Sequence, residues 1–301
     1  MRYLKSILRS LLGILFYISG APVLIRKIKC GEKVTVLVYH NPDPECLEKH
    51  LKYLSKRFHF ITIDKLVHAI RSGDWAMIPS RAAVITLDDG HKDNFRLASL
   101  FAKYEVNPTI YLCGGIVNTS RHFWFESGLP DIPPIKKASY AQLLQLLKES
   151  QGYELEKEYD ERQALNYEEI KAMMKVADFQ SHTKYHPILT QCDSTEVRSE
   201  IAGSKRMLEE LLLKRITHFS YPNGDYSGRE VQEVIDGGYE SARTLDIGWN
   251  HRQTDPYKLR AMPIQDNASL FVLCAQVHGL FGYFKYAFHG SFNGVRPPLI
   301  T

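Results

Sequence analysis

The chain has 301 residues, of which 44% are hydrophobic and 24% charged, an ordinary globular composition long enough for one large barrel or two smaller domains. Its formal net charge of +4 is small and no basic helix with interleaved aromatic residues is predicted, which argues against nucleic acid as a partner. The five cysteines (Cys30, Cys46, Cys113, Cys192 and Cys274) are dispersed, which argues against a disulfide framework and a thiolate zinc site.

The first 31 residues differ from this ordinary composition. Residues 11–25 are nearly all apolar, and the basic residues Arg2, Lys5, Arg9, Arg26, Lys27 and Lys29 flank them. The run is short for a membrane-spanning helix, which needs about 20 residues. A signal peptide is an alternative, but no cleavage site of small residues is evident. We expect residues 1–31 to form an uncleaved membrane-associated segment that lies in the interface or is partly inserted; the alternative is a helix packed on the rest of the protein.

From residue 34 onward, short apolar runs that predict strands alternate with amphipathic segments that predict helices. Strands are expected at 34–39, 82–87, 108–112, 179–181, 218–221, 241–244 and 259–264, and helices at 45–57, 64–72, 94–104, 166–176, 194–213 and 229–235. This alternation predicts an α/β fold with a parallel barrel over residues 32–268.

Two segments do not fit the alternation. Residues 119–165 combine an aromatic cluster that contains Trp124, a proline-rich turn and a mixed-charge stretch. A connection of this length is usually functional or disordered, so we interpret it as an insertion over the barrel mouth. Residues 269–301 are apolar and aromatic, and are expected to form a docking helix or a second membrane contact.

Polar side chains gather where predicted strands end. Asp88 and Asp89 follow the strand 82–87, and His182 and His186 follow the strand 179–181. Two adjacent carboxylates are costly to bury unless a metal takes one as a ligand and leaves the other for proton transfer. One Asp and two His provide three ligands with open positions, the pattern of a catalytic metal site. His40 and Tyr221 also fall at carboxyl ends of strands, where barrel active sites lie.

The chain resembles the polysaccharide deacetylases, the NodB-homology domains of carbohydrate esterase family four. The resemblance covers residues 34–264 and is carried by Thr-Leu-Asp-Asp-Gly at 86–90, Ser-His-Thr-x-x-His-Pro-x-Leu at 181–189 and Tyr-Pro-x-Gly at 221–224. It implies a distorted parallel (β/α) barrel of about seven strands and a metal-dependent N-deacetylase. Tyr39-His40 on the first strand is similar to one branch of the family.

The resemblance also implies roles for individual residues. Asp89, His182 and His186 would bind one divalent metal, with Zn²⁺ expected, and Asp88 would be the general base. The turn that begins at Tyr221 would aim the backbone N–H of Asn223 at the oxyanion. Trp124 could stack on a sugar ring or a lipid.

Two positions depart from the family pattern. Many members have Arg-Pro-Pro-Tyr-Gly at the third motif, with the Arg paired to the catalytic Asp, whereas Ser220 stands at that position here. Arg260, on a late predicted strand, is our expected substitute. Many members also take the general acid from a late Leu-x-x-His-Asp; we assign this role to His40, with His278 and His289 as the late alternatives.

The expected function is metal-dependent hydrolysis of the N-acetyl group of an N-acetylhexosamine in a polysaccharide or a glycolipid. The expected partners are an N-acetylated glycan or lipid-linked sugar and a membrane surface, on an envelope or exopolysaccharide pathway at the cytoplasmic membrane of a bacterium. Two alternatives stay open. A two-His-one-carboxylate set also suits a non-haem iron oxygenase, and the barrel could be a catalytically silent glycan-binding protein.

Overall fold

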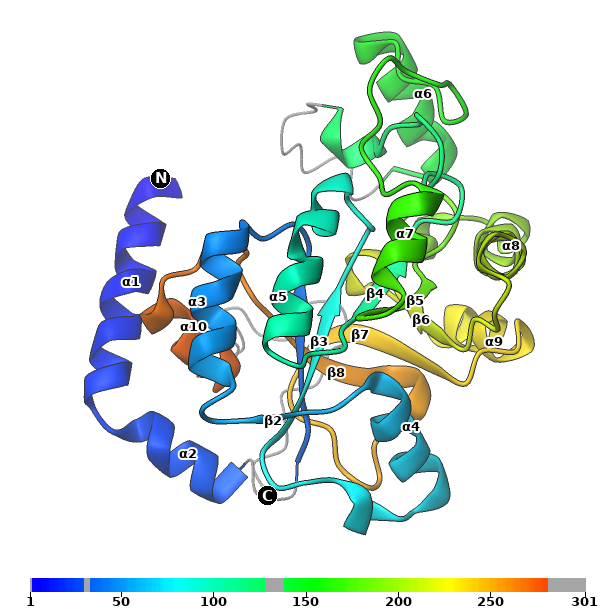
Figure 1. Cartoon of the computed structure of the whole chain (residues 1–301). Coiled ribbons are helices and arrows are strands. Elements are labelled where there is room, and N and C mark those ends of the chain that lie inside the picture. Colours follow the sequence, from blue (N-terminus) through cyan, green and yellow to red (C-terminus); the bar gives the residue numbers. More distant parts are fainter. Residues whose placement is uncertain (1, 30–32, 128–137, 281–301) are drawn as a thin grey trace.

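The computed structural model describes residues 2–29, 33–127 and 138–280 (Figure 1). The strands are β1 (Thr35–Tyr39), β2 (His59–Phe60), β3 (Ala82–Leu87), β4 (Thr109–Leu112), β5 (Asp178–Ser181), β6 (His218–Ser220), β7 (Ser241–Ile247) and β8 (Leu259–Pro263). The α-helices are α1 (Arg2–Ile18), α2 (Ala21–Lys29), α3 (Pro44–Leu54), α4 (Ile63–Ser72), α5 (Ala98–Lys103), α6 (Tyr140–Gln151), α7 (Tyr167–Met173), α8 (Ser194–Leu212), α9 (Gly228–Asp236) and α10 (Leu270–Val277).

Seven of the strands close into a parallel barrel. Their order is β1-β8-β7-β6-β5-β4-β3, and β3 pairs back with β1 to complete the ring. The short β2 pairs with Ala82 and Ala83 at the start of β3. Strand β4 pairs with Thr86 and Leu87 at the end of β3. The predicted parallel α/β barrel is therefore confirmed. Only β2 was missed, because two residues are too few for a periodicity.

The two faces of the barrel wall separate the core into two clusters. Along β1, Leu37 and Tyr39 pack in the larger cluster, which includes residues of α3 on the outside of the wall. Val36 and Val38 instead join the smaller cluster with Leu259 of β8 and residues of α4. Side chains alternate between the faces of a strand, so this second cluster fills the barrel interior.

The N-terminal segment forms two helices instead of one apolar run. The helix is interrupted at Ser19-Gly20, where Gly20 has φ +72°. Helix α1 packs along α10 on the outside of the barrel, and α10 in turn contacts α3 (Figure 1). Among the described helices, none is both long and apolar enough to cross a membrane. Residue 269 is followed by α10, which contacts α1. The choice between a docking helix and a second membrane contact for residues 269–301 stays a prediction, and residues 281–301 lie outside the described part.

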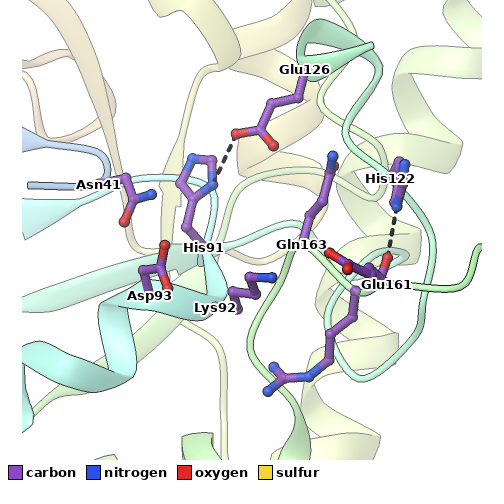
Figure 2. Close-up of a pocket in the computed structure, with 9 residues that line it drawn as sticks. Asn41, His91, Lys92, Asp93, His122, Glu126, Glu161 and Gln163 are labelled. Carbon is purple, nitrogen blue, oxygen red and sulfur yellow. Dashed lines mark hydrogen bonds and ion pairs between the residues drawn. The ribbon is translucent and has the colours of Figure 1, made fainter.

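The insertion 119–165 contains structure that the sequence did not predict. Helix α6 begins with a capping box between Ser139 and Gln142 and ends at Gly152, which has φ +64°. A cavity of about 250 Å³ lies between this insertion and the loops after β1 and β3, and its lining includes Asn41, His91 and Glu126 (Figure 2). The insertion thus borders the carboxyl ends of the strands, as expected for a segment over the barrel mouth.

Candidate active site

Strand β3 delivers two adjacent carboxylates to the barrel mouth. The N–H of Asp88 donates to the carbonyl of Tyr39 at 3.0 Å, which extends the β1–β3 pairing beyond the strand end. Asp89 and Gly90 then turn the chain with φ +71° and +77°. A Cβ at Gly90 would also meet a β4 side chain at 2.5 Å, so glycine is needed here. Asp88 and Asp89 are 3% and 2% exposed, and this turn aims both into the site.

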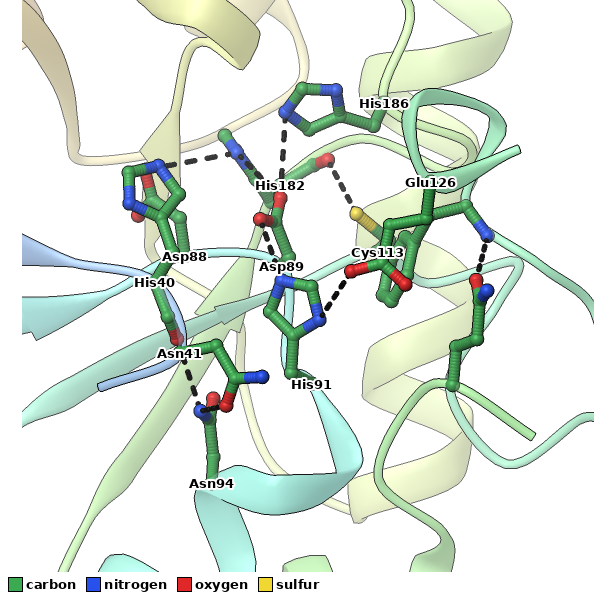
Figure 3. Close-up of polar contacts among 12 residues, drawn as sticks. His40, Asn41, Asp88, Asp89, His91, Asn94, Cys113, Glu126, His182 and His186 are labelled. Atoms are coloured by element: carbon green, nitrogen blue, oxygen red, sulfur yellow. Dashed lines mark hydrogen bonds and ion pairs between the residues drawn. The ribbon is translucent and has the colours of Figure 1, made fainter. Parts of the chain in front are cut away.

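Strand β5 delivers the histidines. His182 follows the strand directly, and its Nδ1 lies 2.8 Å from the carbonyl oxygen of Ser220, which leaves Nε2 toward the carboxylates. The Nε2 atoms of His182 and His186 lie 3.6 and 3.4 Å from Asp89 Oδ1, and His182 Nε2 lies 3.8 Å from Asp88 Oδ2 (Figure 3). Both imidazoles lie on a loop, as expected from the proline after His186.

The loop that carries the histidines is held from two sides. Glu200 of α8 accepts the backbone N–H groups of Lys184 and Tyr185 at 2.8 and 2.9 Å. From the insertion, the indole N–H of Trp124 donates to the carbonyl of His186 at 2.8 Å. His186 has φ +59°, a left-handed conformation that costs free energy in a residue other than glycine. These contacts compensate for that cost.

The environment sets the charge states needed for metal binding. Burial lowers the pKa of His186 to about 4 and also lowers the pKa of His182, so both imidazoles are neutral at neutral pH. Burial by itself raises the pKa of Asp89, but the hydrogen bond from His91 and the two ligand imidazoles outweigh it, so its pKa lies well below the ordinary value. An ionised carboxylate and two neutral imidazoles are the protonation states that bind a cation.

The donor set fits a divalent metal ion. The ligand atoms of Asp89, His182 and His186 all lie within 4.8 Å of one another. Asp89 Oδ1 is buried and, within the described residues, accepts no hydrogen bond, although it faces both imidazole Nε2 atoms. A buried carboxylate oxygen without a partner is costly, and a cation between the three groups would remove that cost. One oxygen and two nitrogens suit Zn²⁺.

Arg243, not Arg260, pairs with Asp88, so the predicted partner was wrong. The guanidinium of Arg243, 0% exposed, donates from Nη2 to Asp88 Oδ2 and to the hydroxyl of Ser220. It supplies from β7 the positive charge that the family pattern places at position 220. Arg243 is opposite Leu259 in the β7–β8 register, so Arg260, the next residue, points to the other face of the wall. A charged residue in a predicted barrel strand was the signal that the sequence analysis overlooked.

A second residue missed by sequence reasoning is His91. Its Nε2 lies 3.2 Å from Asp89 Oδ2, and its Nδ1 lies 3.3 Å from Oε1 of Glu126, which belongs to the insertion (Figure 3). The first contact occupies one oxygen of Asp89 and leaves the other toward the ligand imidazoles. The insertion therefore reaches the carboxylate through His91 as well as the loop through Trp124.

His40 lies at the end of β1 beside Asp88 (Figure 3). Asp266 accepts its backbone N–H at 3.0 Å, and the side-chain amide of Asn94 donates to its carbonyl at 3.0 Å. The alternative His278 is buried where α1 meets α10, with its ring 6.0 Å from Phe16. His289 lies outside the described residues. Of the two described candidates, His40 is the one grouped with the carboxylates and the ligand imidazoles.

The predicted substrate-binding residues have different environments. Tyr221 is 1% exposed, and its hydroxyl donates to the carbonyl of Tyr257 at 3.2 Å, so its side chain supports the turn instead of lining the mouth. Asn223 is exposed on that turn with φ +56°. Trp124 is half-buried, and its N–H is committed to the histidine loop.

Comparison with known proteins identifies the class that this barrel and site define. The family model for polysaccharide deacetylases matches residues 78–242, which include both carboxylates and both histidines. The chain belongs to the polysaccharide deacetylase family. This relationship supports a deacetylase, and therefore a hydrolase, function.

Individual relatives are distant in sequence and similar in fold. The chain is 23% identical over 249 residues to the "Putative polysaccharide deacetylase YxkH" of Bacillus subtilis, which covers 79% of this chain and 73% of that protein. The deacetylase PplD of Streptococcus pyogenes, solved with acetate, superposes with a TM-score of 0.61 at 18% identity, over 82% of this chain and 99% of PplD. IcaB of Ammonifex degensii superposes with a TM-score of 0.59 at 16% identity, over 82% of this chain and 98% of IcaB. These likenesses support the barrel fold.

Proposed function

We propose that the protein is a metal-dependent carbohydrate deacetylase that hydrolyses the N-acetyl group of an N-acetylhexosamine in a polysaccharide or glycolipid. The observation that carries this proposal is the convergence of Asp89, His182 and His186 beside a second carboxylate, Asp88, which lies outside the ligand set. Asp89, His182 and His186 would hold the metal, for which we propose Zn²⁺. When bound, such an ion supplies a Lewis acid for the acetyl carbonyl and lowers the pKa of its water.

Asp88 is our proposed general base. Arg243 holds its Oδ2, whereas Oδ1 is buried without a hydrogen-bond partner in the described part of the chain. That free oxygen can take the proton from the attacking water, and the guanidinium fixes the orientation of the carboxylate throughout. The water oxygen then bonds to the acetyl carbon.

The leaving amine needs a proton as the carbon–nitrogen bond breaks, and His40 is our proposed donor. The backbone N–H of Asn223 is proposed to stabilise the oxyanion. The products are acetate and a free amino sugar, so hydrolysis adds one water and needs no oxidant. The cavity whose lining includes Asn41, His91 and Glu126 provides polar walls beside the site for a further part of the glycan.

Acetate release from a panel of N-acetylated oligosaccharides and lipid-linked sugars tests the reaction. We expect about one divalent metal per chain, lost in His182→Ala and retained in the exposed control His251→Ala. Asp88→Asn should keep the metal but lower kcat at least ~10²-fold. The exposed control Asp236→Asn should keep both the metal and the wild-type kcat. Glycan binding without acetate release, or turnover that needs oxygen and ferrous iron, would overturn the proposal.

A further inference from the structure

Helix α1 carries a row of exposed apolar side chains on the face turned away from the barrel. Leu8, Leu11, Leu15 and Ile18 are 56%, 54%, 60% and 70% exposed. Their spacing of three and four residues places them on one side of the helix. Contiguous exposed apolar surface of this kind marks an interaction site on a folded protein.

The opposite side of α1 is already occupied. A Cβ at Gly13 would lie 2.9 Å from the carbonyl oxygen of Phe271 on α10, so the two helices are in close contact. Tyr17 packs edge-on against Phe271 at 5.3 Å. The exposed row therefore belongs to a helix fixed on the barrel, and the apolar surface continues on α2 with Val23 and Leu24, which are 48% and 59% exposed.

The positive charge of residues 1–31 indicates that the exposed apolar row binds an anionic surface. Residues 1–31 contain six of the 38 basic residues (Arg2, Lys5, Arg9, Arg26, Lys27 and Lys29) and none of the 34 acidic ones. The remaining chain has 32 basic and 34 acidic residues, a net charge of −2, so the segment carries the whole positive excess. A helix is about 10–12 Å wide, comparable to the Debye length of roughly 8 Å at physiological ionic strength. An anionic surface that the apolar row touches would therefore attract the cations of α1 and α2, those on the far side of a helix more weakly because salt screens them, and the attraction would be stronger at low salt.

We propose that α1 and α2 dock the protein in the plane of an anionic lipid surface, with the row formed by Leu8, Leu11, Leu15 and Ile18 buried among the lipids. Within the described residues no helix could span the bilayer, and an amphipathic helix that cannot span lies in the interface. Because α1 is fixed on α10, docking would hold the barrel in one orientation on the membrane. This inference does not depend on the deacetylase activity.

Vesicle flotation with the full chain tests the proposal. Binding to phosphatidylcholine vesicles that contain about one-quarter phosphatidylglycerol should be at least ~10-fold tighter than binding to pure phosphatidylcholine, and should weaken as salt rises from about 0.1 to 1 M. The double substitution Leu11→Glu/Leu15→Glu should reduce binding at least ~10-fold. The matched control is Leu146→Glu, which adds charge at a 47% exposed leucine of α6 and should bind as the wild type. Circular dichroism and Tm identify any variant that misfolds.

Three results would overturn the proposal. Equal binding to both kinds of vesicle would exclude recognition of anionic lipid. A dimer in light scattering that Leu11→Glu/Leu15→Glu abolishes, without vesicle binding, would assign the row to a second copy of the chain. Vesicle binding that occurs only after deletion of residues 281–301 would show that this tail covers the row in the native protein.

Discussion

At the scale of single residues, the proposed acid–base pair depends on side chains that follow two neighbouring, directly paired strands of the barrel. His40 follows β1, and Asp88 follows β3. If His40 protonates the leaving amine, His40→Ala should retain the metal and lose most activity on acetamido sugars. It should lose less on an activated ester, whose leaving group needs no proton. Paired kcat measurements on both substrates are the check. Equal losses on both substrates would indicate a structural role for His40 and would contradict its assignment as the acid.

Arg243 and Arg260 form a natural pair for comparison. Removal of one partner from a buried ion pair leaves the other charge without compensation and costs about 3–5 kcal/mol. Arg243→Met should therefore lower the free energy of unfolding by roughly that amount and reduce kcat at least ~10²-fold, because Asp88 loses its orientation. Arg260→Met, on the other face of the wall, should change stability by less than about 1 kcal/mol.

Denaturant unfolding and kcat of both single variants measure this difference. The double variant Arg243→Met/Asp88→Asn removes both charges and should recover part of the lost stability, which a double-mutant cycle quantifies. An Arg260→Met variant with the larger loss of activity would restore the original prediction.

At the scale of elements, the carboxylate of Glu200 on α8 supports the loop that carries His182 and His186, the proposed metal ligands. Burial raises the pKa of Glu200 to about 7, although the N–H groups of Tyr185 and Lys184 oppose this shift. A carboxyl group whose folded pKa lies above its unfolded value binds a proton on folding. Its contribution to stability is therefore greatest at low pH and falls as pH rises from about 4.5 to about 7.

Glu200→Gln removes this titration while its amide oxygen can still accept both N–H groups. Relative to the wild type, the variant should gain stability as pH rises from about 5 to about 8, by up to roughly 3 kcal/mol. The measurement is urea unfolding of both proteins at these two pH values. The histidines contribute equally to both proteins, so their titration cancels when the two free energies of unfolding are subtracted at each pH. Glu200→Ala leaves the two N–H groups without an acceptor and should be destabilised at both pH values by about 1–3 kcal/mol. A difference between wild type and Glu200→Gln that does not vary with pH would contradict the assignment.

The sequence predicted elements whose pattern is local and missed features set by contacts far apart in the chain. All seven strands of the closed barrel were predicted. Strands such as β1 and β3 are the nearly continuous apolar runs of buried parallel strands, whereas β5 and β6 are short and partly polar. The partner of Asp88 was assigned to Arg260 because strand register, which decides the face of each side chain, depends on pairing and not on local sequence. His91 was missed because its two contacts, with Asp89 across the turn and with Glu126 of the insertion, are set by the folded backbone and leave no sequence pattern.

At the scale of the whole molecule, the candidate site residues could be predicted from the sequence, but the long-range contacts that hold the fold around them could not. Asp89, His182 and His186 could be grouped from their positions after strands, since parallel strands bring their carboxyl ends to one mouth. The dispersed thiols also fit the expectation, because Cys46, Cys113 and Cys192 are free. The contact of α1 with α10 joins the two ends of the described chain. Side-chain packing of that kind leaves no periodic signal in either segment, so the sequence left a packed helix and a membrane segment as alternatives.

The contact between α1 and α10 depends on the absence of a side chain at Gly13. A methyl group there would approach the carbonyl oxygen of Phe271 to 2.9 Å, which is backbone and cannot turn aside. Gly13→Ala should therefore destabilise the protein by about 1–3 kcal/mol, although alanine favours the helix by up to about 1 kcal/mol. Gly228→Ala, at the start of α9 with open space around its Cβ, is the matched control and should be neutral or slightly stabilising. Unfolding curves measure both effects, and limited trypsin digestion reports whether cleavage in the basic stretch 26–29 becomes faster. Unchanged stability and unchanged cleavage in Gly13→Ala would show that α1 is not held on the barrel, and that lipid docking would tether the barrel without orienting it.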